Sequence, residues 1–272
     1  MRRDTVRSSD GTLLASYQWA PSGTVRGDVV LVHGVGEHLG RYEHVATALT
    51  EHGYRVRGVD FRGHGQSEGK RGHITRFERY VDDLRTAIGL RPGPHAIFAH
   101  SMGTAVSLDH LRDASCWALA ASGLAVGIGV EAPGWKLAGA RVLSRLLPGL
   151  SMDNEIPLEN ICANEQVRRD YQADPLVFST ITPRWFTEFL AAHERIHAAA
   201  PRYEVPALFA YGTDDRIVSI EAIHRFAEHY GAERTLTPYP GMRHEILNET
   251  ERDRVIADFL RFLDAHNPGD AA

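Results

Sequence analysis

Short apolar runs alternate along this chain with segments in which apolar residues recur at helical spacing. Several of the runs are almost uninterrupted, which is typical of parallel strands that are covered on both faces. The alternation predicts an α/β fold with a mostly parallel central sheet, right-handed crossovers and helices on both faces. The runs that we expect to form strands are residues 28–33, 54–60, 95–99, 117–122, 207–211 and 234–238.

The segments between these runs carry one-sided apolar stripes. The first stripe lies within residues 42–49, and Gly53 follows where a helix commonly ends. An antiparallel hairpin is expected over residues 5–20, around an Asp-Gly pair. Further stripes predict helices within residues 81–88, 223–230 and 255–263.

Residues 123–206 interrupt this alternation. They contain apolar helical pieces within 135–150, several prolines, and an amphipathic stretch over 184–200. Because a structureless loop of that length is uncommon in a compact domain, we predict an inserted helical cap over the sheet. In this prediction residues 1–127 and 201–272 form the α/β core, and residues 128–200 form the cap.

The composition narrows the class of protein. A chain of 272 residues with 43% hydrophobic and 24% charged residues suits one large domain or a domain with an insertion, and it argues against disorder and coiled coils. The 30 Lys and Arg against 35 Asp and Glu give a net charge of −5 without a basic cluster. Sequence-independent nucleic-acid binding is therefore not expected. The oligomeric state stays open.

The sequence also bears on the cellular location. Two cysteines are too few for a disulfide framework and are expected to be reduced thiols. The first residues carry positive charge but no apolar stretch, so no secretory signal is expected. The most apolar run, residues 117–130, is shorter than the ~20 residues of a membrane span. We expect a cytoplasmic protein that is at most peripheral to a membrane.

A serine directly follows one of the predicted strands. Residues 95–99 lead into the sequence HSMGT and then into helical spacing. Strand, sharp turn and helix are the setting of the G-x-S-x-G nucleophile elbow, in which the second neighbours of the serine are small. For Ser101 these are Ala99 and Gly103, so alanine replaces the first glycine of the motif. We interpret Ser101 as a nucleophile; a helix N-cap is the alternative.

Polar residues follow the next two predicted strands along the chain. Asp214 and Asp215 come after residues 207–211, and His244 comes after residues 234–238. Both ends fall at the carboxyl edge of the sheet, where such folds place their sites. A serine nucleophile needs a base, and the base needs an anion that fixes its tautomer. The residues alone leave both aspartates open as that anion.

Hydrolysis through a tetrahedral intermediate also needs donors for a developing oxyanion. One donor is expected to be the backbone N–H of Met102, directly after the serine. The loop after residues 28–33 reads HGVGEH, and its glycines allow a close backbone approach. We place the second donor at the N–H of Val35. The alternative for this loop is a simple glycine-rich turn.

Taken together, these segments resemble the α/β-hydrolase superfamily and, within it, the monoacylglycerol lipase and lysophospholipase group. The resemblance covers nearly the whole chain in order. The matching stretches are HGVGEHLGRY, DFRGHGQSEGKRGH, HSMGT, YQADPLV, YGTDDRIV and YPGMRHEILNE. The second stretch, with Asp60, Arg62 and Ser67, is expected to support the scaffold.

The resemblance implies an α/β-hydrolase fold and a cofactor-free serine hydrolase. Ser101 would be the nucleophile and His244 the base. Asp215 would be the acid, because the family's acid directly precedes an arginine. The implied reaction is cleavage of monoacyl lipid esters, foremost monoacylglycerol to glycerol and fatty acid, through an acyl-enzyme. A lysophospholipase or a broad-specificity carboxylesterase is the alternative within the family.

The resemblance also implies a substrate site. Polar contacts to a glycerol head group would fall on Glu37, Arg41 and Tyr171, and the cap would form an apolar acyl channel. Leu247 stands where mammalian members carry a further histidine, which is a departure from the glycerol site. The apolar residues near the start of the cap either pack within it or make transient contact with a membrane or micelle. They are Trp135, Leu137, Val142, Leu143, Leu146, Leu147 and Leu150.

Two hypotheses from other classes remain. His193 and His197 spell H-E-x-x-H, which on a helix can bind zinc in a metallohydrolase, although the expected extension of the motif is absent. The chain could also be a catalytically silent binding scaffold, but such a scaffold would be expected to lose at least one of the three catalytic groups.

Overall fold

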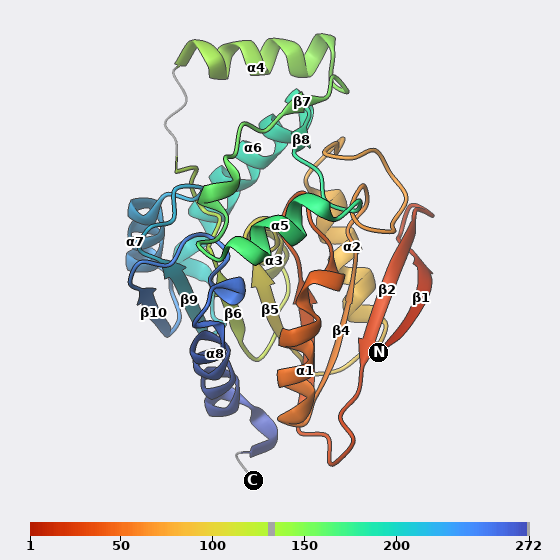
Figure 1. Ribbon diagram of the computed structural model, residues 1–272, viewed down its shortest axis with the longest axis vertical. Helices are drawn as coiled ribbons and strands as arrows, with labels where there is room; N and C mark the ends of the chain where they lie inside the picture. Colours follow the sequence, from red (N-terminus) through yellow and green to blue (C-terminus); the bar gives the residue numbers. More distant parts are fainter. Residues whose placement is uncertain (130–133, 271–272) are drawn as a thin grey trace.

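The computed structural model describes residues 1–129 and 134–270 and is built around an eight-stranded sheet with the order β1-β2-β4-β3-β5-β6-β9-β10 (Figure 1). β2 pairs antiparallel with β1 and with β4, and the remaining neighbours are parallel. The expected fold class is confirmed, and each expected parallel strand forms within two residues of its predicted ends. The strands are β1 (Arg2–Arg7), β2 (Leu13–Trp19), β3 (Gly27–Val32), β4 (Tyr54–Val59), β5 (Ala96–His100), β6 (Leu119–Ser122), β9 (Ala207–Gly212) and β10 (Arg234–Tyr239).

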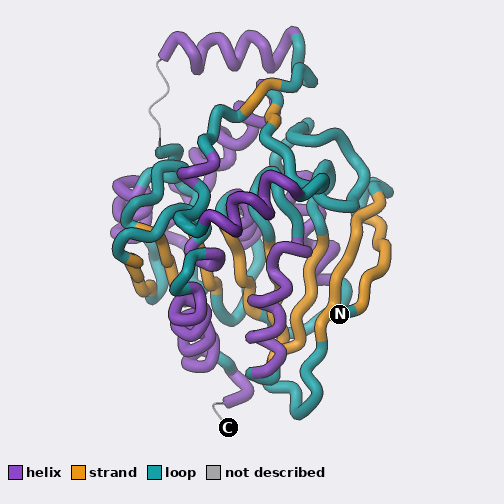
Figure 2. Tube along the Cα trace, in the orientation of Figure 1, coloured by secondary structure: helices purple, strands orange, loops and turns teal. Residues whose placement is uncertain are grey.

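Helices cover both faces of this sheet (Figure 2). One hydrophobic core contains α1 (Glu43–Glu51) and α8 (Arg252–His266). The other contains residues of α2 (Glu78–Gly89), α3 (Met102–Leu111), α6 (Pro183–Ala199) and α7 (Ile220–His229). β3 serves both cores, because Val29 and Leu31 face one and Val30 and Val32 face the other. This explains why four successive residues of β3, from Val29 to Val32, are apolar rather than every second one.

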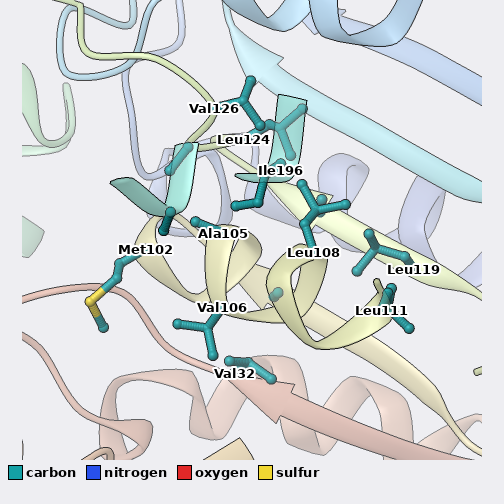
Figure 3. Packing of buried hydrophobic residues seen from close by; sticks show 14 of the residues in the cluster. Val32, Met102, Ala105, Val106, Leu108, Leu111, Leu119, Leu124, Val126 and Ile196 are labelled. Atoms are coloured by element: carbon teal, nitrogen blue, oxygen red, sulfur yellow. The ribbon is translucent and has the colours of Figure 1, made fainter. Parts of the chain in front are cut away.

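α3 is the most enclosed helix of the site region, since every residue from Met102 to Leu111 is buried. Figure 3 shows it between Val32 of the sheet and Ile196 of α6. A helix that is covered all round cannot shift without disturbing several packed layers. The residue that precedes it is therefore held in place by the core.

The segment between β6 and β9 lies at the carboxyl edge of the sheet (Figure 1). Its elements are α4 (Gly134–Leu146), β7 (Met152–Asp153), α5 (Glu165–Ala173), β8 (Thr180–Ile181) and α6, together with the 3-10 turn η2 (Leu158–Asn160). Apolar periodicity did not reveal α5 or the β7-β8 pair. The C-terminal half of α6 is part of the core, since Ile196 and Ala199 are buried there. The division at residues 128 and 200 stays a prediction, and residues 130–133 lie outside the described chain.

None of the helices within the described residues combines the length and the apolarity needed to cross a membrane.

A buried ion pair fixes the loop that follows β4. Asp83 of α2 has a fully buried side chain and accepts hydrogen bonds from Ser8 Oγ and from the backbone N–H, Nε and Nη2 of Arg62. Burial raises the pKa of this carboxyl, and the Arg62 guanidinium opposes that rise. The scaffold role expected for Arg62 follows from these contacts.

We predict that Asp83→Ala lowers the free energy of unfolding by about 3–5 kcal/mol, because it removes the fully buried counter-charge of Arg62 and leaves that guanidinium with the partly exposed Asp10. Asp82→Ala, at a partly exposed neighbour that forms ion pairs with Arg79 and Arg85, is the control and should cost less than about 1 kcal/mol. Urea unfolding of both variants measures the difference, and equal losses would contradict the prediction.

Candidate active site

Ser101 occupies a strained turn between β5 and α3. Its φ of 51° and ψ of −126° lie outside the regions that non-glycine residues usually adopt. Gly103 must lack a side chain, since a Cβ there would lie 2.6 Å from the carbonyl oxygen of His33. Ala99 is a regular residue of β5, paired with Val32 and Ala121, so alanine fits where the motif has its first glycine. The sharp turn places the Ser101 hydroxyl at the carboxyl edge of the sheet.

His244 lies between the serine and an aspartate. Its Nε2 is 2.8 Å from Ser101 Oγ, and its Nδ1 is 2.8 Å from Asp215 Oδ2. All three side chains are buried. The other oxygen of Asp215 accepts hydrogen bonds from the backbone N–H groups of Ile217 and Val218. Asp214 is exposed, and the geometry therefore places Asp215, not Asp214, beside the imidazole.

The surroundings of the imidazole change its basicity. Burial lowers the pKa of His244, but the carboxylates of Asp215, Glu245 and Glu37 together more than offset this, so the pKa lies above its ordinary value. Burial raises the pKa of Asp215, while His244 and two backbone N–H groups bring it below its ordinary value. The ring of His100 lies 4.9 Å from that of His244, and burial lowers the pKa of His100 to about 3. At neutral pH, His100 is therefore uncharged beside His244.

The two residues expected to supply oxyanion donors, Met102 and Val35, lie near Ser101. Met102 is the first residue of α3, where a backbone N–H has no partner within the helix. The loop that carries Val35 approaches closely, since a Cβ on Gly34 would lie 3.0 Å from the Cβ of Ser101. Gly36 has a φ of 76°, and a Cβ there would lie 2.4 Å from the carbonyl oxygen of Phe178. The glycines thus let this loop fit between the serine and the cap segment.

Two cavities of different character meet at Ser101. A cavity of about 370 Å³, which we call the polar cavity because it holds the charged and polar side chains, is lined by His244, Glu37, Tyr171, Gln172 and Glu245 and also by apolar side chains such as Ile156, Leu158 and Phe178. A second, mostly apolar cavity of about 240 Å³ also has Ser101 in its lining. Ser101 and Val35 line both cavities. The apolar lining includes Met102, Ala125, Ile128, Ile181, Trp185, Phe186, Phe189 and Val218.

The residues expected to contact a head group take different positions. Glu37 and Tyr171 line the polar cavity, whereas Arg41 lies behind it, with its guanidinium 4.6 Å from the centre of the Tyr171 ring. Arg41 donates to Glu37 Oε2 at 2.7 Å and forms two further hydrogen bonds of 2.7 Å with the carboxylate of Glu245. Leu247 is buried in the core and does not line the cavity.

Sequence reasoning did not identify Glu245. Burial raises its pKa, but Arg41 outweighs burial and lowers that pKa to about 2. Burial also raises the pKa of Glu37, which stays above its ordinary value because Glu245 repels it and Arg41 compensates only in part. The signal available in the sequence was the position of an acidic residue directly after the expected base.

The H-E-x-x-H motif lies on α6. His197 is exposed and its Nε2 is 2.7 Å from the carbonyl oxygen of Val126, while His193 is buried against the ring of Phe189. Within residues 1–129 and 134–270, no group of three or more His, Cys, Asp or Glu side chains is arranged to hold a metal ion. The geometry therefore gives both histidines packing and hydrogen-bonding roles.

Comparisons with known proteins agree with this fold. Residues 23–251 match the family model Hydrolase_4, described as serine aminopeptidase, S33. The chain is 31% identical over 257 residues to a monoacylglycerol lipase of Mycolicibacterium smegmatis, covering 91% of each chain. It is 27% identical to a phospholipase of Bacillus subtilis, covering 88% of this chain and 95% of that one.

A solved structure is similar as well. The crystal structure of a Paleococcus ferrophilus monoacylglycerol lipase superposes with a TM-score of 0.87 at 30% sequence identity, and the match covers 93% of this chain and 99% of that one. The expected resemblance is thereby confirmed at the level of the family. The chain belongs to the Hydrolase_4 family of α/β-hydrolases and is a serine hydrolase.

Proposed function

We propose that this enzyme hydrolyses monoacyl lipid esters, foremost monoacylglycerol, to an alcohol and a fatty acid. The observation that carries the proposal is the position of Ser101, hydrogen-bonded to His244 at the junction of an apolar and a polar cavity. An ester with one acyl chain and a small polar head matches this arrangement, because its apolar acyl chain and its polar alcohol part meet at the carbonyl group that Ser101 would attack. The similarity to monoacylglycerol lipases supports the same substrate class.

The reaction would proceed in two halves. Nε2 of His244 takes the proton of Ser101 Oγ as this oxygen attacks the ester carbonyl, and the N–H groups of Val35 and Met102 stabilise the oxyanion. His244 then gives the proton to the oxygen of the leaving alcohol, and the acyl group stays on Ser101. In the second half, water attacks the acyl-enzyme with His244 again as the base; the bond to Ser101 Oγ then breaks, His244 returns the proton to this oxygen, and the fatty acid is released. Asp215 keeps the proton-bearing Nδ1 oriented throughout.

The cavities orient the substrate in this proposal. The acyl chain lies against the aromatic side chains of Trp185, Phe186 and Phe189, and the alcohol lies near Glu37 and Tyr171. A long flexible acyl chain gains from burial against such a surface. Lysophospholipids and simple esters remain the alternatives, because they share the ester and the single chain.

The cap would bring the site to a lipid surface. α4 packs on α6, and Arg184 Nη2 donates to the carbonyl oxygen of Ser144. The outer side of α4 and the loop after it expose large apolar residues with Arg141 and Arg145 between them. Figure 1 shows α4 as the outermost helix, beyond the carboxyl edge of the sheet. These exposed residues are Trp135, Val142, Leu146, Leu147, Leu150 and Met152. We propose a transient contact of this face with membranes or micelles.

The two free cysteines are compatible with a cytoplasmic location, which is part of the same proposal. Cys162 is buried and Cys116 is half-buried. Burial raises the pKa of each thiol to about 12, so neither is a reactive thiolate at neutral pH.

The first test is a substrate panel with purified protein. We expect kcat/KM to be highest for monoacylglycerols, lower for lysophosphatidylcholine, and measurable for p-nitrophenyl esters, with all activity lost in Ser101→Ala. Hydrolysis of aminoacyl p-nitroanilides in place of esters, as the description of the matched family would suggest, would overturn the proposal.

The second prediction concerns the acid. Asp215→Asn should lower kcat by about 10³–10⁴-fold, because an amide does not hold the imidazole in the required tautomer. The base acts only when neutral, so wild-type kcat/KM should fall as the pH drops through the raised pKa of His244, with a midpoint above the ordinary value of 6.5. In Asp215→Asn this midpoint should move to lower pH, since the charge that raises the pKa is gone.

Asp214→Asn is the matched control, with the same change one residue away on an exposed side chain. It should keep both the rate and the acid limb of the wild type. Equal losses in the two variants would show that the acid is assigned to the wrong residue.

The third prediction concerns the cap. Leu146→Asp, at a side chain that is 72% exposed, should lower activity on vesicle-bound monoacylglycerol several-fold, because it places a charge on the apolar face. Activity on a monomeric short-chain ester should not change. Val25→Asp, an exposed apolar residue away from α4, is the control for added charge. A loss on the monomeric ester equal to the loss on vesicles would contradict the proposed lipid contact.

A further inference from the structure

The polar cavity beside Ser101 has an uneven charge. Glu37, Asp153 and Glu245 line it, and its lining in the described part of the chain includes no lysine or arginine. Asp153 lies on the exposed β7, where solvent screens it, whereas Glu37 and Glu245 are buried. The charges that a bound head group meets in the closed part of the cavity are therefore carboxylates.

Arg41 does not balance these charges from inside the cavity. Its side chain is 10% exposed, and Glu37, Glu245 and the ring of Tyr171 surround its guanidinium. Three hydrogen bonds of 2.7 Å commit the two terminal nitrogens to the two carboxylates. The Arg41 guanidinium thus lies between Glu37 and Glu245 and donates its hydrogen bonds to these carboxylates, not into the cavity.

Both carboxylates are held rigidly. Glu37 Oε1 accepts hydrogen bonds from the backbone N–H of Gly34 and the hydroxyl of Tyr42, each at 2.6 Å. Glu245 Oε2 also accepts a hydrogen bond from Asn248 Nδ2 at 2.8 Å. Groups fixed in this way cannot turn away from an unfavourable ligand.

We propose that Glu37 and Glu245 make this cavity select against anionic head groups, so that the alcohol part of a good substrate is neutral or cationic. The inference rests on the proposed ester hydrolysis and narrows its substrate class. A phosphate on the glycerol would enter a pocket whose buried side chains Glu37 and Glu245 already carry excess negative charge, and like charges repel more strongly where they are shielded from solvent. A neutral polyol carries no charge for the carboxylates to repel, and its hydroxyl groups can donate hydrogen bonds to acceptor oxygens of the lining. The two carboxylates would thus give specificity by weakening the binding of anionic head groups, not by strengthening the binding of neutral ones.

The inference can be tested by measuring kcat/KM of the wild-type enzyme for octanoate esters that differ in head-group charge. The three substrates are 1-octanoylglycerol, 1-octanoylglycerol 3-phosphate and octanoylcholine, each below the concentration at which it forms micelles. We expect kcat/KM for the phosphate ester to lie at least about tenfold below that for the neutral ester. The cationic ester should be hydrolysed at least as well as the neutral one. An anionic ester that matches or exceeds the neutral one would overturn the inference.

The variant Glu245→Gln tests whether the buried carboxylate of Glu245 causes the selection against anionic head groups. Glu245→Gln keeps the size of the side chain and removes one of the two buried carboxylates. It should narrow the neutral-to-anionic ratio of kcat/KM by about tenfold, whatever it does to the absolute rates. Asp214→Asn, which removes a carboxylate that does not line the cavity, should leave this ratio unchanged.

The outcomes separate the two proposals. If Glu245→Gln lowers both rates equally and the ratio stays as in the wild type, Glu245 only positions His244, and its selective role is wrong. If the variant does not fold, as judged by circular dichroism, the wild-type charge series decides alone. If none of the esters is hydrolysed, the proposed function itself fails. If the neutral and anionic esters are hydrolysed equally, only the selection fails.

Discussion

The imidazole of His244 uses both of its nitrogens, one toward Ser101 and one toward Asp215, each at 2.8 Å. A neutral imidazole has one donor and one acceptor nitrogen, so the contact with Asp215 decides which nitrogen is free to take a proton. The rest of the site supports this geometry. Asp215 is tied to two backbone N–H groups, and the loop that carries His244 is tied to Arg41 through Glu245.

Backbone strain and close packing hold Ser101, the other hydrogen-bond partner of His244, in place. The φ of 51° at Ser101 is unfavourable for a non-glycine residue, with a cost of the order of 1–3 kcal/mol. It persists because α3 is buried along its whole length and because Gly103 allows the chain to pass the carbonyl oxygen of His33. The stability of two extended cores therefore supports a locally strained turn.

The loop after β3, which carries Gly34 and Val35, and the loop that carries His244 belong to one network of charges. Gly34 donates to Glu37, Glu37 pairs with Arg41, and Arg41 pairs with Glu245, which follows His244. The same contacts that position the two loops also give the polar cavity its negative character. Position and selectivity would then be properties of one structure, since a fixed carboxylate both anchors a neighbour and repels an anion.

The sequence by itself determined the features that depend on neighbouring residues. Continuous apolar runs and helical stripes indicated the strands and helices, because such patterns are local. The order of serine, acid and base after successive strands indicated the reaction class, because the carboxyl ends of parallel strands share one edge of the sheet. The residues alone did not separate Asp214 from Asp215; the family resemblance favoured one, and the fold brought that one to His244. Packing alone decided that Arg41 faces Glu245, 204 residues away, rather than a ligand. Contacts of this kind depend on how distant loops meet at the sheet edge, and no periodicity in the chain encodes that meeting.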